Sequence, residues 1–338
     1  MLNDKNILVT GGTGSFGKSF ISSVLKSYKP RKLIVYSRDE LKQSEMQEKW
    51  PDNHTPLRYF IGDIRDYHRL KMAMEGVDIV IHAAALKQVP AAEYNPFEAV
   101  KTNIIGSQNV IDASITKGVK KVIALSTDKA AAPTNLYGAT KLTSDKLFIA
   151  ANNYKGDNDI RLAVVRYGNV MGSRGSVIPY FMKKKELEAL PITDSRMTRF
   201  NITLDEGVNF VLNCLKNMWG GEIFVPKIPS YRITDVAEAV APNSEIKIIG
   251  IRPGEKLHEE MITATDSLNT AEFKDYYVIL PSSNKIDWSV EEFLNKSNKN
   301  KGRMCEEGFS YNSEMNDRFL SVKELRNLID KNIDNYNL

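Results

Sequence analysis

The sequence feature that most constrains the fold is a glycine-rich turn placed between an apolar strand and an amphipathic helix. The strand is Ile7–Thr10, the glycines from Gly11 to Gly17 have the spacing G-x-x-G-x-x-G, and the helix runs toward Lys26. Small residues allow a tight turn, a close approach of pyrophosphate and close helix–sheet packing, and a helix N-terminus favours an anion. This setting predicts a dinucleotide-binding βαβ unit. The residues predicted to hold the dinucleotide in this turn are Gly11, Thr13, Gly14, Ser15, Phe16 and Gly17.

Short apolar runs alternate with amphipathic stretches along much of the chain. This pattern predicts the α/β class, with a Rossmann-type doubly wound parallel sheet and a smaller C-terminal substrate-binding lobe. The 338 residues suffice for two unequal domains. We expect the dinucleotide-binding domain at 1–170, with 200–225 returning to it, the smaller lobe at 171–199 and 226–283, and a C-terminal extension at 284–338.

The expected elements follow from the same periodicities. The expected strands are Ile7–Thr10, Lys32–Tyr36, Leu57–Ile61, Asp78–His82, Lys121–Leu125, Arg161–Arg166, Glu222–Val225 and Glu245–Ile251. The later helices are expected at Pro96–Lys117, Val177–Glu188, Leu204–Lys216, Thr234–Val240 and Val322–Ile329.

The end of the second strand favours NADP over NAD. Folds specific for NAD usually place Asp or Glu about 20 residues beyond the glycines, where it binds the ribose 2′-hydroxyl. Ser37 stands at that place and is followed by Arg38 and Lys42. A hydroxyl and two cations suit a 2′-phosphate. The alternative is that the two cations only face solvent in a loop.

Further cofactor contacts are expected near the next strand ends. Asp63 and Ile64 follow the third strand, where a carboxylate can approach the adenine amino group. Ala83 and Ala84 follow the fourth strand, and their small side chains let the backbone approach the cofactor. The amide of Asn103, in the helix that follows, is expected to bridge backbone or water near the site.

The reactive groups are expected at the carboxyl end of the strand that begins at Lys121. Asp128 and Lys129 follow this strand, at the edge where open α/β sheets bind ligands. In the next helix, Tyr137 and Lys141 are four residues apart and share a face. A lysine beside a phenol is expected to lower its pKa, so that the tyrosine takes a proton from an alcohol while a cofactor takes the hydride. The alternative, a surface Tyr/Lys pair, is weakened by the dinucleotide motif upstream.

Several polar residues are expected to face a substrate. Lys87 lies just past the fourth strand, and Asn169 and Arg174 lie in a glycine-rich run that crosses into the second lobe. Arg199 and Arg252 are expected to grip a diphosphate, which arginine binds well. The alternative for each arginine is a surface ion pair.

The charge balance and the few cysteines exclude several classes of protein. The 46 basic and 42 acidic residues give a net charge of +4, with no basic stripe that would argue for nucleic acid. Cys214 and Cys305 are the only cysteines, which implies no disulfide framework and a reducing compartment. We find no metal-ligand spacing, no signal peptide and no apolar run of the roughly 20 residues that span a bilayer. We therefore expect a cytoplasmic protein that binds no metal, nucleic acid or membrane.

Together these motifs resemble the extended short-chain dehydrogenases/reductases that act on nucleotide sugars. More closely, the chain resembles the bacterial configuration-inverting UDP-N-acetylglucosamine 4,6-dehydratases that begin pseudaminic acid synthesis. The resemblance runs from about Asn3 to Pro281 and includes the long stretches Thr10–Gly17, Ala124–Lys146 and Val165–Pro179. The positions that depart from the family's pattern include Gln88, Ala132 and Asn201.

The resemblance implies that UDP-N-acetylglucosamine binds between the two lobes, in a homo-oligomer that is a dimer or a hexamer. Asn169, Arg199 and Arg252 match phosphate contacts of the superfamily, while Glu255 is expected near the uridine ribose and Lys87 near the sugar. The implied reaction is oxidation at C4, loss of water across C5 and C6, and return of the hydride to C6. The implied product is UDP-2-acetamido-2,6-dideoxy-β-L-arabino-hex-4-ulose.

The resemblance also gives the reactive residues roles. Asp128 is expected to act as the acid at C6 and Lys129 as the base at C5, where retaining sugar dehydratases have Asp-Glu. A lysine acts as a base only if its pKa is lowered, and Lys141 and the nicotinamide are expected to supply the charge that lowers it. The alternatives are a nucleotide-sugar epimerase or a retaining 4,6-dehydratase on the same fold, and a non-catalytic NADP-sensing protein.

Overall fold

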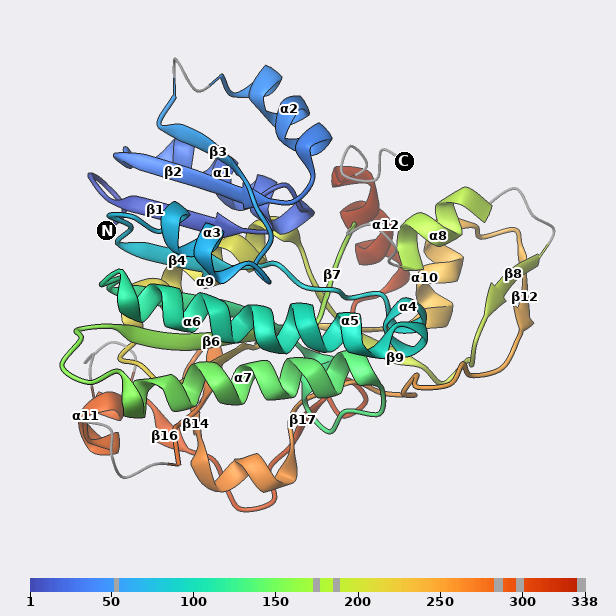
Figure 1. The fold of residues 1–338 in the computed structure, drawn as a ribbon. Coiled ribbons are helices and arrows are strands. Elements are labelled where there is room, and N and C mark those ends of the chain that lie inside the picture. Colours follow the sequence, from blue (N-terminus) through green and yellow to red (C-terminus); the bar gives the residue numbers. More distant parts are fainter. Residues whose placement is uncertain (52–54, 173–176, 185–188, 283–287, 296–300, 333–338) are drawn as a thin grey trace.

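The computed structural model describes residues 1–51, 55–172, 177–184, 189–282, 288–295 and 301–332 of the chain. Within these ranges the largest element is a ten-stranded sheet with helices on both faces (Figure 1). The seven strands from β3 to β10 are parallel, and their order contains the 3-2-1-4-5-6 arrangement of the Rossmann fold. The predicted fold class is therefore confirmed. The strands, in the order in which they lie, are β16 (Arg303–Met304), β14 (Thr270–Glu272), β15 (Tyr276–Ile279), β10 (Ile223–Pro226), β6 (Arg161–Tyr167), β5 (Lys121–Thr127), β4 (Ile79–His82), β1 (Asn6–Thr10), β2 (Lys32–Ser37) and β3 (Leu57–Ile61).

The apolar character of the central strands explains why they lie inside. Every residue of β1 and of β4 is buried, as expected for parallel strands that helices cover on both sides. The expected strands are all confirmed. Seven of them lie in the large sheet, and the eighth is β12 (Glu245–Ile248), which pairs with β8 (Ala189–Ile192) in a separate two-stranded sheet.

Helices from two parts of the chain cover the two faces of the sheet. One apolar cluster joins Phe20 and Val24 of α1 to Val208 and Val211 of α9, and a second joins Val110 of α6 to other residues on the opposite face. Each fully buried large apolar side chain stabilises the fold by about 1.5–3 kcal/mol. The helices around the sheet are α1 (Ser15–Ser27), α2 (Glu40–Lys49), α3 (Tyr67–Ala73), α4 (Val89–Tyr94), α5 (Pro96–Val100), α6 (Gly106–Thr116), α7 (Leu136–Tyr154), α9 (Leu204–Asn217) and α11 (Val290–Asn295).

The helix expected at Pro96–Lys117 is continuous but not uniform. Between α5 and α6 the residues Lys101–Ile105 form a π-helical turn. Such wide turns occur frequently at functional sites. Here the turn buries Thr102 and Asn103, and Thr102 lines the cavity described below.

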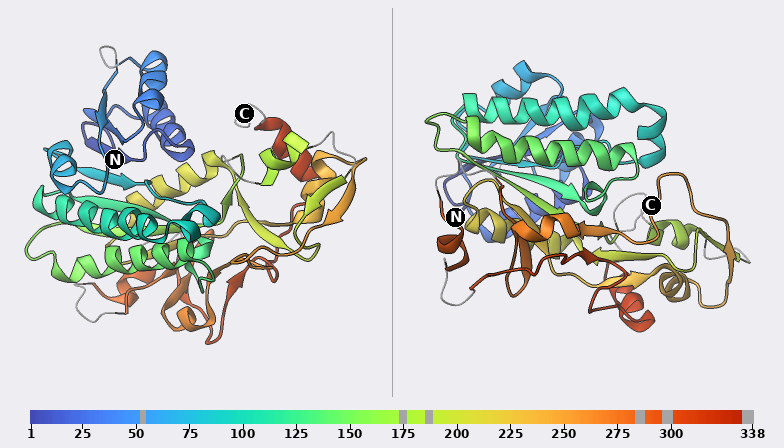
Figure 2. Two further views of the ribbon diagram at one scale, coloured as in Figure 1. Left: turned by 45° about the vertical axis from the view of Figure 1, so that its right-hand side comes forward. Right: turned by 90° about the horizontal axis from the view of Figure 1, so that it is seen from below.

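The second lobe lies at one end of the sheet, on the right of Figure 1, and Figure 2 shows it in two further views. Its core packs α10 and α12 against each other through residues such as Val236, Leu325 and Ile329. The helix expected at Val322–Ile329 is thus confirmed, and it docks on this lobe. The elements of the lobe, in addition to β8 and β12, are β7 (Asn169–Val170), β9 (Thr198–Ile202), β11 (Ser230–Arg232), α8 (Val177–Lys184), α10 (Ile233–Val240) and α12 (Val322–Lys331). The pair β13 (Glu260–Ile262) and β17 (Tyr311–Asn312) packs instead against the large sheet.

After α10 the chain does not remain in the smaller lobe, where the stretch 226–283 was expected to lie. The structure places β14 and β15, from the stretch 226–283, in the large sheet as antiparallel strands next to β10. The physical reason is that their apolar residues, including Ala271 and Val278, complete the core on the α1 side. The expected extension 284–338 also adds β16 to this sheet and β17, as the partner of β13, to the core beneath it.

The described residues meet the requirements of neither a membrane-spanning helix nor a metal site. Within the described ranges, no helix combines the length and the apolarity needed to cross a bilayer. In the same ranges, no group of three or more His, Cys, Asp and Glu side chains is arranged to hold a metal ion.

Candidate active site

A cavity of about 1180 Å³ lies between the large sheet and the second lobe. One wall consists of residues at or just after the carboxyl ends of the parallel strands, such as Gly11, Ala83 and Thr127. The other wall includes Tyr231 and Arg252 of the second lobe. Open α/β sheets bind their ligands at this edge, so the cavity lies where the strand order predicts a binding site.

The glycine-rich turn between β1 and α1 leaves room for phosphate groups. Gly11 has a φ of +66°, and a Cβ at this residue would lie 2.9 Å from the backbone of Ala84. A Cβ on Gly17 would lie 2.5 Å from the carbonyl oxygen of Gly12, so α1 can pack on the turn only with glycine there. No side chain caps the first turn of α1, and a free helix N-terminus suits an anion. These residues therefore fit the pyrophosphate of a dinucleotide.

The structure brings nearly all predicted cofactor residues to this cavity. The predicted residues that line it are Gly11, Thr13, Gly14, Ser15, Phe16, Gly17, Ser37, Arg38, Lys42, Asp63, Ile64, Ala83, Ala84, Tyr137 and Lys141.

The residues expected to select NADP lie at the carboxyl end of β2 and in the first turn of α2. The hydroxyl of Ser37 is 2.8 Å from that of Thr13. Arg38 Nη1 lies 3.4 Å from a carboxylate oxygen of Asp63, and Lys42 forms an ion pair with Asp39. Such exposed pairs are worth only about 0–1 kcal/mol, so a phosphate group can replace either carboxylate at little cost.

Two residues predicted to contact the cofactor form hydrogen bonds with other protein groups. The carboxylate of Asp63 accepts hydrogen bonds from Arg65, which outweigh the effect of burial and lower its pKa. Asp63 also lines the cavity, so its expected contact with adenine stays a prediction. The amide of Asn103 bridges backbone as expected, because it bonds both the N–H and the C=O of Leu86 at 2.8 and 2.9 Å. The side chain of Asn103 does not line the cavity, however, and its remaining bond goes to Thr140.

Tyr137 and Lys141 both line the cavity, one turn apart on α7. The helix starts at this place because the Asn135 side chain caps it by accepting from the N–H of Gly138 at 2.8 Å. Burial raises the pKa of Tyr137 to about 12, and the charge of Lys129 and a hydrogen bond with Thr127 offset this rise only in part. The groups that lower this pKa are thus Lys129 and Thr127 and not the predicted Lys141, whose Nζ donates to the carbonyl of Leu125 at 2.8 Å. Lys129 is instead the cation that favours the phenolate.

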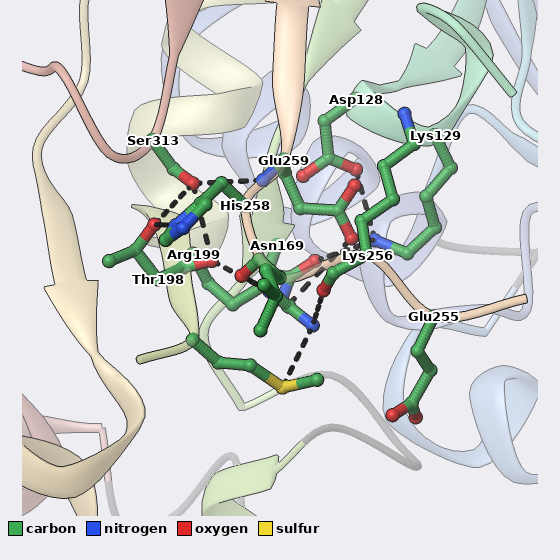
Figure 3. Close-up of polar contacts among 12 residues, drawn as sticks. Asp128, Lys129, Asn169, Thr198, Arg199, Glu255, Lys256, His258, Glu259 and Ser313 are labelled. Carbon is green, nitrogen blue, oxygen red and sulfur yellow. Dashed lines mark hydrogen bonds and ion pairs between the residues drawn. The ribbon is translucent and has the colours of Figure 1, made fainter. Parts of the chain in front are cut away.

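Asp128 and Lys129 form a buried cluster with a second carboxylate (Figure 3). Lys129 Nζ lies 3.0 Å from Asp128 Oδ1, 3.1 Å from Glu259 Oε1 and 3.2 Å from Asn169 Oδ1. Asp128 is fully buried and Glu259 is 3% exposed, whereas the Lys129 side chain is 23% exposed and lines the cavity. Lys129 is therefore the cavity-facing member of a charged group drawn from both parts of the molecule.

The environment separates the charge states of these groups. Burial raises the pKa of Asp128, and the charge of Lys129 offsets this rise only in part. For Glu259, the cations Lys129 and Arg199 outweigh the effect of burial and lower the pKa. Burial alone would lower the pKa of Lys129, but Asp128 and Glu259 outweigh it and raise the pKa. The expected lowering by Lys141 and a nicotinamide thus differs from the structure, in which carboxylates surround the amine.

The two arginines expected to grip a diphosphate have different environments. Arg199 directs its two terminal nitrogens to three carbonyl oxygens and the sulfur of Met197, and its Nε lies 3.7 Å from Glu259 Oε1 in an ion pair. Most of its donors are therefore engaged within the protein, where they hold the segment 256–259 in place. Arg252 is 54% exposed at the cavity wall and has only a 3.5 Å ion pair with Glu255. Arg252 is thus free to bind an anion.

The remaining predicted substrate residues also line the cavity, with one exception. Lys87, Asn169 and Glu255 all lie on its wall. Glu255 Oε2 is buried and has no hydrogen-bond partner in the part of the chain that the structure describes. Arg174 and the end of the helix expected at Val177–Glu188 lie outside the described residues.

Comparison with known proteins places the chain in a family. The sequence profile of the family described as polysaccharide biosynthesis protein matches residues 7–281. The chain belongs to this family. A protein from Campylobacter jejuni subsp. jejuni serotype O:2 named UDP-N-acetylglucosamine 4,6-dehydratase (inverting) is 59% identical over 331 residues, which cover 97% of this chain and 98% of that protein. The resemblance predicted from the sequence is thereby confirmed.

A second relative and a solved structure are also similar to this chain. A protein from Rickettsia conorii named UDP-glucose 4-epimerase is 39% identical over 337 residues, covering 97% of this chain and 96% of that protein. The X-ray structure of Pen from Bacillus thuringiensis has a TM-score of 0.88 and 41% identity, and the match covers 98% of this chain and 99% of that chain. This chain therefore shares its fold with that structure along nearly its whole length.

Sequence reasoning missed one residue at the centre of this family member's site. Glu259 follows the turn that contains Arg252 and Gly254, and it stands beside a second glutamate, Glu260. Nothing in this local pattern marks one of the two as buried. The signal was indirect: Lys129 at a buried strand end requires a counter-charge, because buried charges are almost always paired.

Proposed function

We propose that this chain is a UDP-N-acetylglucosamine 4,6-dehydratase that inverts C5 and forms UDP-2-acetamido-2,6-dideoxy-β-L-arabino-hex-4-ulose. The observation that carries the proposal is the meeting of Tyr137 with the Asp128–Lys129 pair at the end of β5, beside a turn that fits a dinucleotide. The 59% identity to the Campylobacter jejuni protein with this name supports the same reaction.

We infer that the cofactor is NADP. Its pyrophosphate would lie on the glycine turn, and the backbone of Ala83 and Ala84 would approach the cofactor closely. Its 2′-phosphate would be held by Ser37, Arg38 and Lys42. When bound, this group supplies the hydride acceptor for C4 and the hydride donor for C6.

We propose that the sugar nucleotide occupies the part of the cavity between Lys129 and the second lobe. Arg252 is the proposed phosphate contact, because its guanidinium is exposed at the wall and only weakly paired. Glu255 is proposed near the ribose, and Lys87 and Asn169 near the sugar. Arg199 is proposed to act indirectly, since its donors hold the segment that carries Glu259.

The proposed proton transfers use three residues. Tyr137 accepts the proton of the C4 hydroxyl, and the charge of Lys129 stabilises the resulting phenolate. The C4 ketone acidifies the C5 hydrogen, which Lys129 removes. Asp128 donates a proton to the C6 hydroxyl, which leaves as water. The raised pKa of Asp128 supports this role, because the carboxyl group must hold its proton until the leaving group needs it.

Epimerisation at C4 is the rival reaction, since a relative that is 39% identical is named UDP-glucose 4-epimerase. An epimerase needs no acid at C6. The Oδ2 atom of the buried Asp128 has no hydrogen-bond partner among the described residues, which favours dehydration because a neutral carboxyl group is suited to that position.

The decisive test is incubation of the purified protein with NADP and UDP-N-acetylglucosamine, followed by mass spectrometry and NMR. We expect a product that has lost one water molecule and carries a C4 keto group and a C6 methyl group. A product of unchanged mass with inverted C4 would establish the epimerase. Thermal stabilisation by NADP without any turnover would instead support a sensor protein.

We predict that Arg38→Ala weakens NADP binding selectively. A charge-assisted contact to a 2′-phosphate is worth roughly 1–3 kcal/mol, and NAD lacks this phosphate. Calorimetric titration of the apo-protein with both cofactors measures the difference. Arg196→Ala, which changes an exposed arginine that does not line the cavity, is the matched control. Equal losses for NAD and NADP in the Arg38 variant would contradict the assignment.

A further inference from the structure

The reactive residues of the two elements β5 and α7 are joined by a short linker, residues 131–135. Asp128 and Lys129 lie just before the linker, and Tyr137 follows it in the first turn of α7. The linker contains no helix or strand of its own. Its position, and with it the place of the Tyr137 phenol relative to the end of β5, therefore depends on contacts with other segments.

The carbonyl oxygen of Gly254 binds this linker from the opposite wall of the cavity. Gly254 lies between β12 and β13, in the turn that also carries Arg252, the proposed phosphate contact. Its carbonyl accepts hydrogen bonds from Asn135 Nδ2 at 2.8 Å and from Thr134 Oγ1 at 3.2 Å. A Cβ on Gly254 would lie 2.9 Å from Asn135 Cβ, so the two segments pack in direct contact. The turn that carries Arg252 thus rests on the linker.

A further contact joins the same two segments at the other end of the linker. Lys256 Nζ donates to the carbonyl of Ala131 at 2.7 Å. Between the two points of attachment, the turn is closed by a hydrogen bond from the N–H of Glu255 to the carbonyl of Arg252 at 3.1 Å. A segment that is held at two points cannot pivot about either of them. The linker therefore fixes the orientation of the turn 252–255 as well as its distance.

The side chain of Asn135 has two partners, which belong to different walls of the cavity. Its Oδ1 atom accepts from the N–H of Gly138 at 2.8 Å and so caps α7, the helix that carries Tyr137. Its Nδ2 atom donates to the carbonyl of Gly254. Asp and Ser cap helices about as well as Asn, but Asp has no donor and Ser has a single oxygen for both tasks. The bond to Gly254 is what the amide adds to the cap.

The relation between the phosphate contact and the phenol matters for the proposed chemistry. A sugar nucleotide is held by its diphosphate but reacts at C4 of the sugar, some distance away. Reacting atoms must approach to about 3–3.5 Å, and a misplacement of about 1 Å can lower the rate about 10²-fold. Because Arg252 and Tyr137 lie on different walls of the cavity, a shift of one wall against the other would carry the C4 hydroxyl away from the phenol.

We propose that Asn135 is a positioning residue that holds the turn 252–255 and the start of α7 in one fixed relation, an inference that rests on the proposed oxidation of a UDP-sugar at C4. A substrate anchored by its diphosphate at Arg252 then presents its C4 hydroxyl to Tyr137. Asn135 takes no part in the proton transfers. Its contribution is to the rate of C4 oxidation and not to the affinity for the diphosphate, because Arg252 stays on the turn and moves with it.

The test is Asn135→Asp, which keeps the acceptor for Gly138 and replaces the donor to Gly254 by an oxygen atom. Asn135→Ser also keeps a cap, adds no charge, and has a shorter side chain. With NADP bound, both variants should unfold near the wild-type temperature and bind UDP, measured by calorimetry, with little change in affinity. Their C4 oxidation of saturating UDP-N-acetylglucosamine, followed by rapid mixing as the absorbance of reduced cofactor, should slow by roughly 10–10²-fold.

Asn158→Asp is the matched control for this substitution. It removes a hydrogen bond of the same kind, from Nδ2 to the carbonyl of Lys155 at 2.9 Å, on an exposed loop that does not line the cavity. The rate of C4 oxidation in this variant should equal that of the wild type.

A double-mutant cycle with Arg252→Ala separates positioning from a general weakening of α7. If Asn135 acts through the phosphate contact, Asn135→Asp should slow C4 oxidation much less in the Arg252→Ala protein than in the wild type, because the turn no longer anchors the substrate. Independent sites would give the same slowing in both proteins, to within a factor of about two. Such additivity would overturn the proposal and show that Asn135 only supports the helix.

Three further outcomes would also contradict the proposal. They are wild-type C4 oxidation in Asn135→Asp, a loss of UDP affinity that accounts for the whole effect of this variant, and unchanged UDP affinity in Arg252→Ala. A wild-type protein that forms neither reduced cofactor nor product from UDP-N-acetylglucosamine would overturn the proposed function and this inference with it. A failure confined to the variants would leave the proposed function intact.

Discussion

Replacing Tyr137 by phenylalanine is expected to slow C4 oxidation by roughly 10²–10⁴-fold, the range typical for loss of a positioned proton acceptor. The change removes one oxygen atom and leaves the ring that packs with Ala92 and Ala99. The fold and the binding of cofactor should therefore be retained. Rapid mixing of the variant, loaded with cofactor, with UDP-N-acetylglucosamine measures the first step through the absorbance of reduced cofactor.

The pH dependence of the same step supplies an independent check. Burial raises the pKa of Tyr137 to about 12, so the phenolate is a minor species at neutral pH and its fraction grows as pH rises. The wild-type rate of C4 oxidation should therefore increase with pH, and the phenylalanine variant should lose this dependence. Tyr167→Phe is the matched control, because it removes another buried phenolic oxygen from the cavity wall. A Tyr137→Phe protein that oxidises C4 at a near-normal rate would show that the tyrosine is structural.

The parts of this site that sequence analysis predicted are those encoded over short distances along the chain. The apolar run Lys121–Leu125 stops shortly before Asp128 and Lys129, and the structure places both residues directly after β5, in the 3₁₀ turn Asp128–Ala130. Tyr137 and Lys141 share a helix face, as their spacing requires. The glycines between β1 and α1 line the cavity for the same reason, since the turn and its helix form one local unit.

Spacing did not predict where the ends of long side chains lie. Lys141 shares a face with Tyr137, yet its amine turns to the carbonyl of Leu125 and leaves Lys129 as the cation near the phenol. Arg199 was expected to bind phosphate, but its donors are used by the carbonyls of Lys256 and Leu257. Both outcomes depend on backbone carbonyls brought close by the fold, and these carry no signal in the sequence.

Contacts between distant segments account for what was missed. Glu259 meets Lys129 only because β13, which follows it, packs beside the turn at the end of β5, and Ser313 reaches Glu259 only because β17 pairs with β13. The short strands β14 and β15 likewise join the large sheet through pairing with β10. Three- and four-residue strands have too few residues for a periodic pattern to reveal their partner.

The largest effect on the second half of the reaction is expected from changes at Lys129. Lys129→Ala should still allow oxidation at C4, seen as reduced cofactor, but should slow the loss of water by roughly 10²–10⁴-fold. The alanine variant also leaves Asp128 and Glu259 without their shared cation, and removing one partner of a buried ion pair costs about 3–5 kcal/mol of stability. Thermal unfolding must therefore be measured alongside the partial reactions.

Lys129→Arg separates the charge of the lysine from its ability to act as a base. Arginine keeps the cation between the two carboxylates, so the variant should be more stable than Lys129→Ala. An arginine cannot lose its proton in a protein, and its water-loss step should therefore be as slow as that of the alanine variant. Lys183→Ala, which changes an exposed lysine on the cavity wall, serves as the control for the substitution itself.

The stereochemistry at C5 tests the same assignment in the wild-type protein. If Lys129 removes the C5 proton and a donor on the other face returns one, reaction in deuterated water should place deuterium at C5 in the L-arabino configuration. The hydrogen that arrives at C6 should be the one that left C4, because the bound cofactor carries it between these carbons without exchange with water. NMR of the product distinguishes these positions. Normal dehydration by either Lys129 variant, or a wild-type product with the D-xylo configuration, would show that Lys129 is not the base of an inverting reaction.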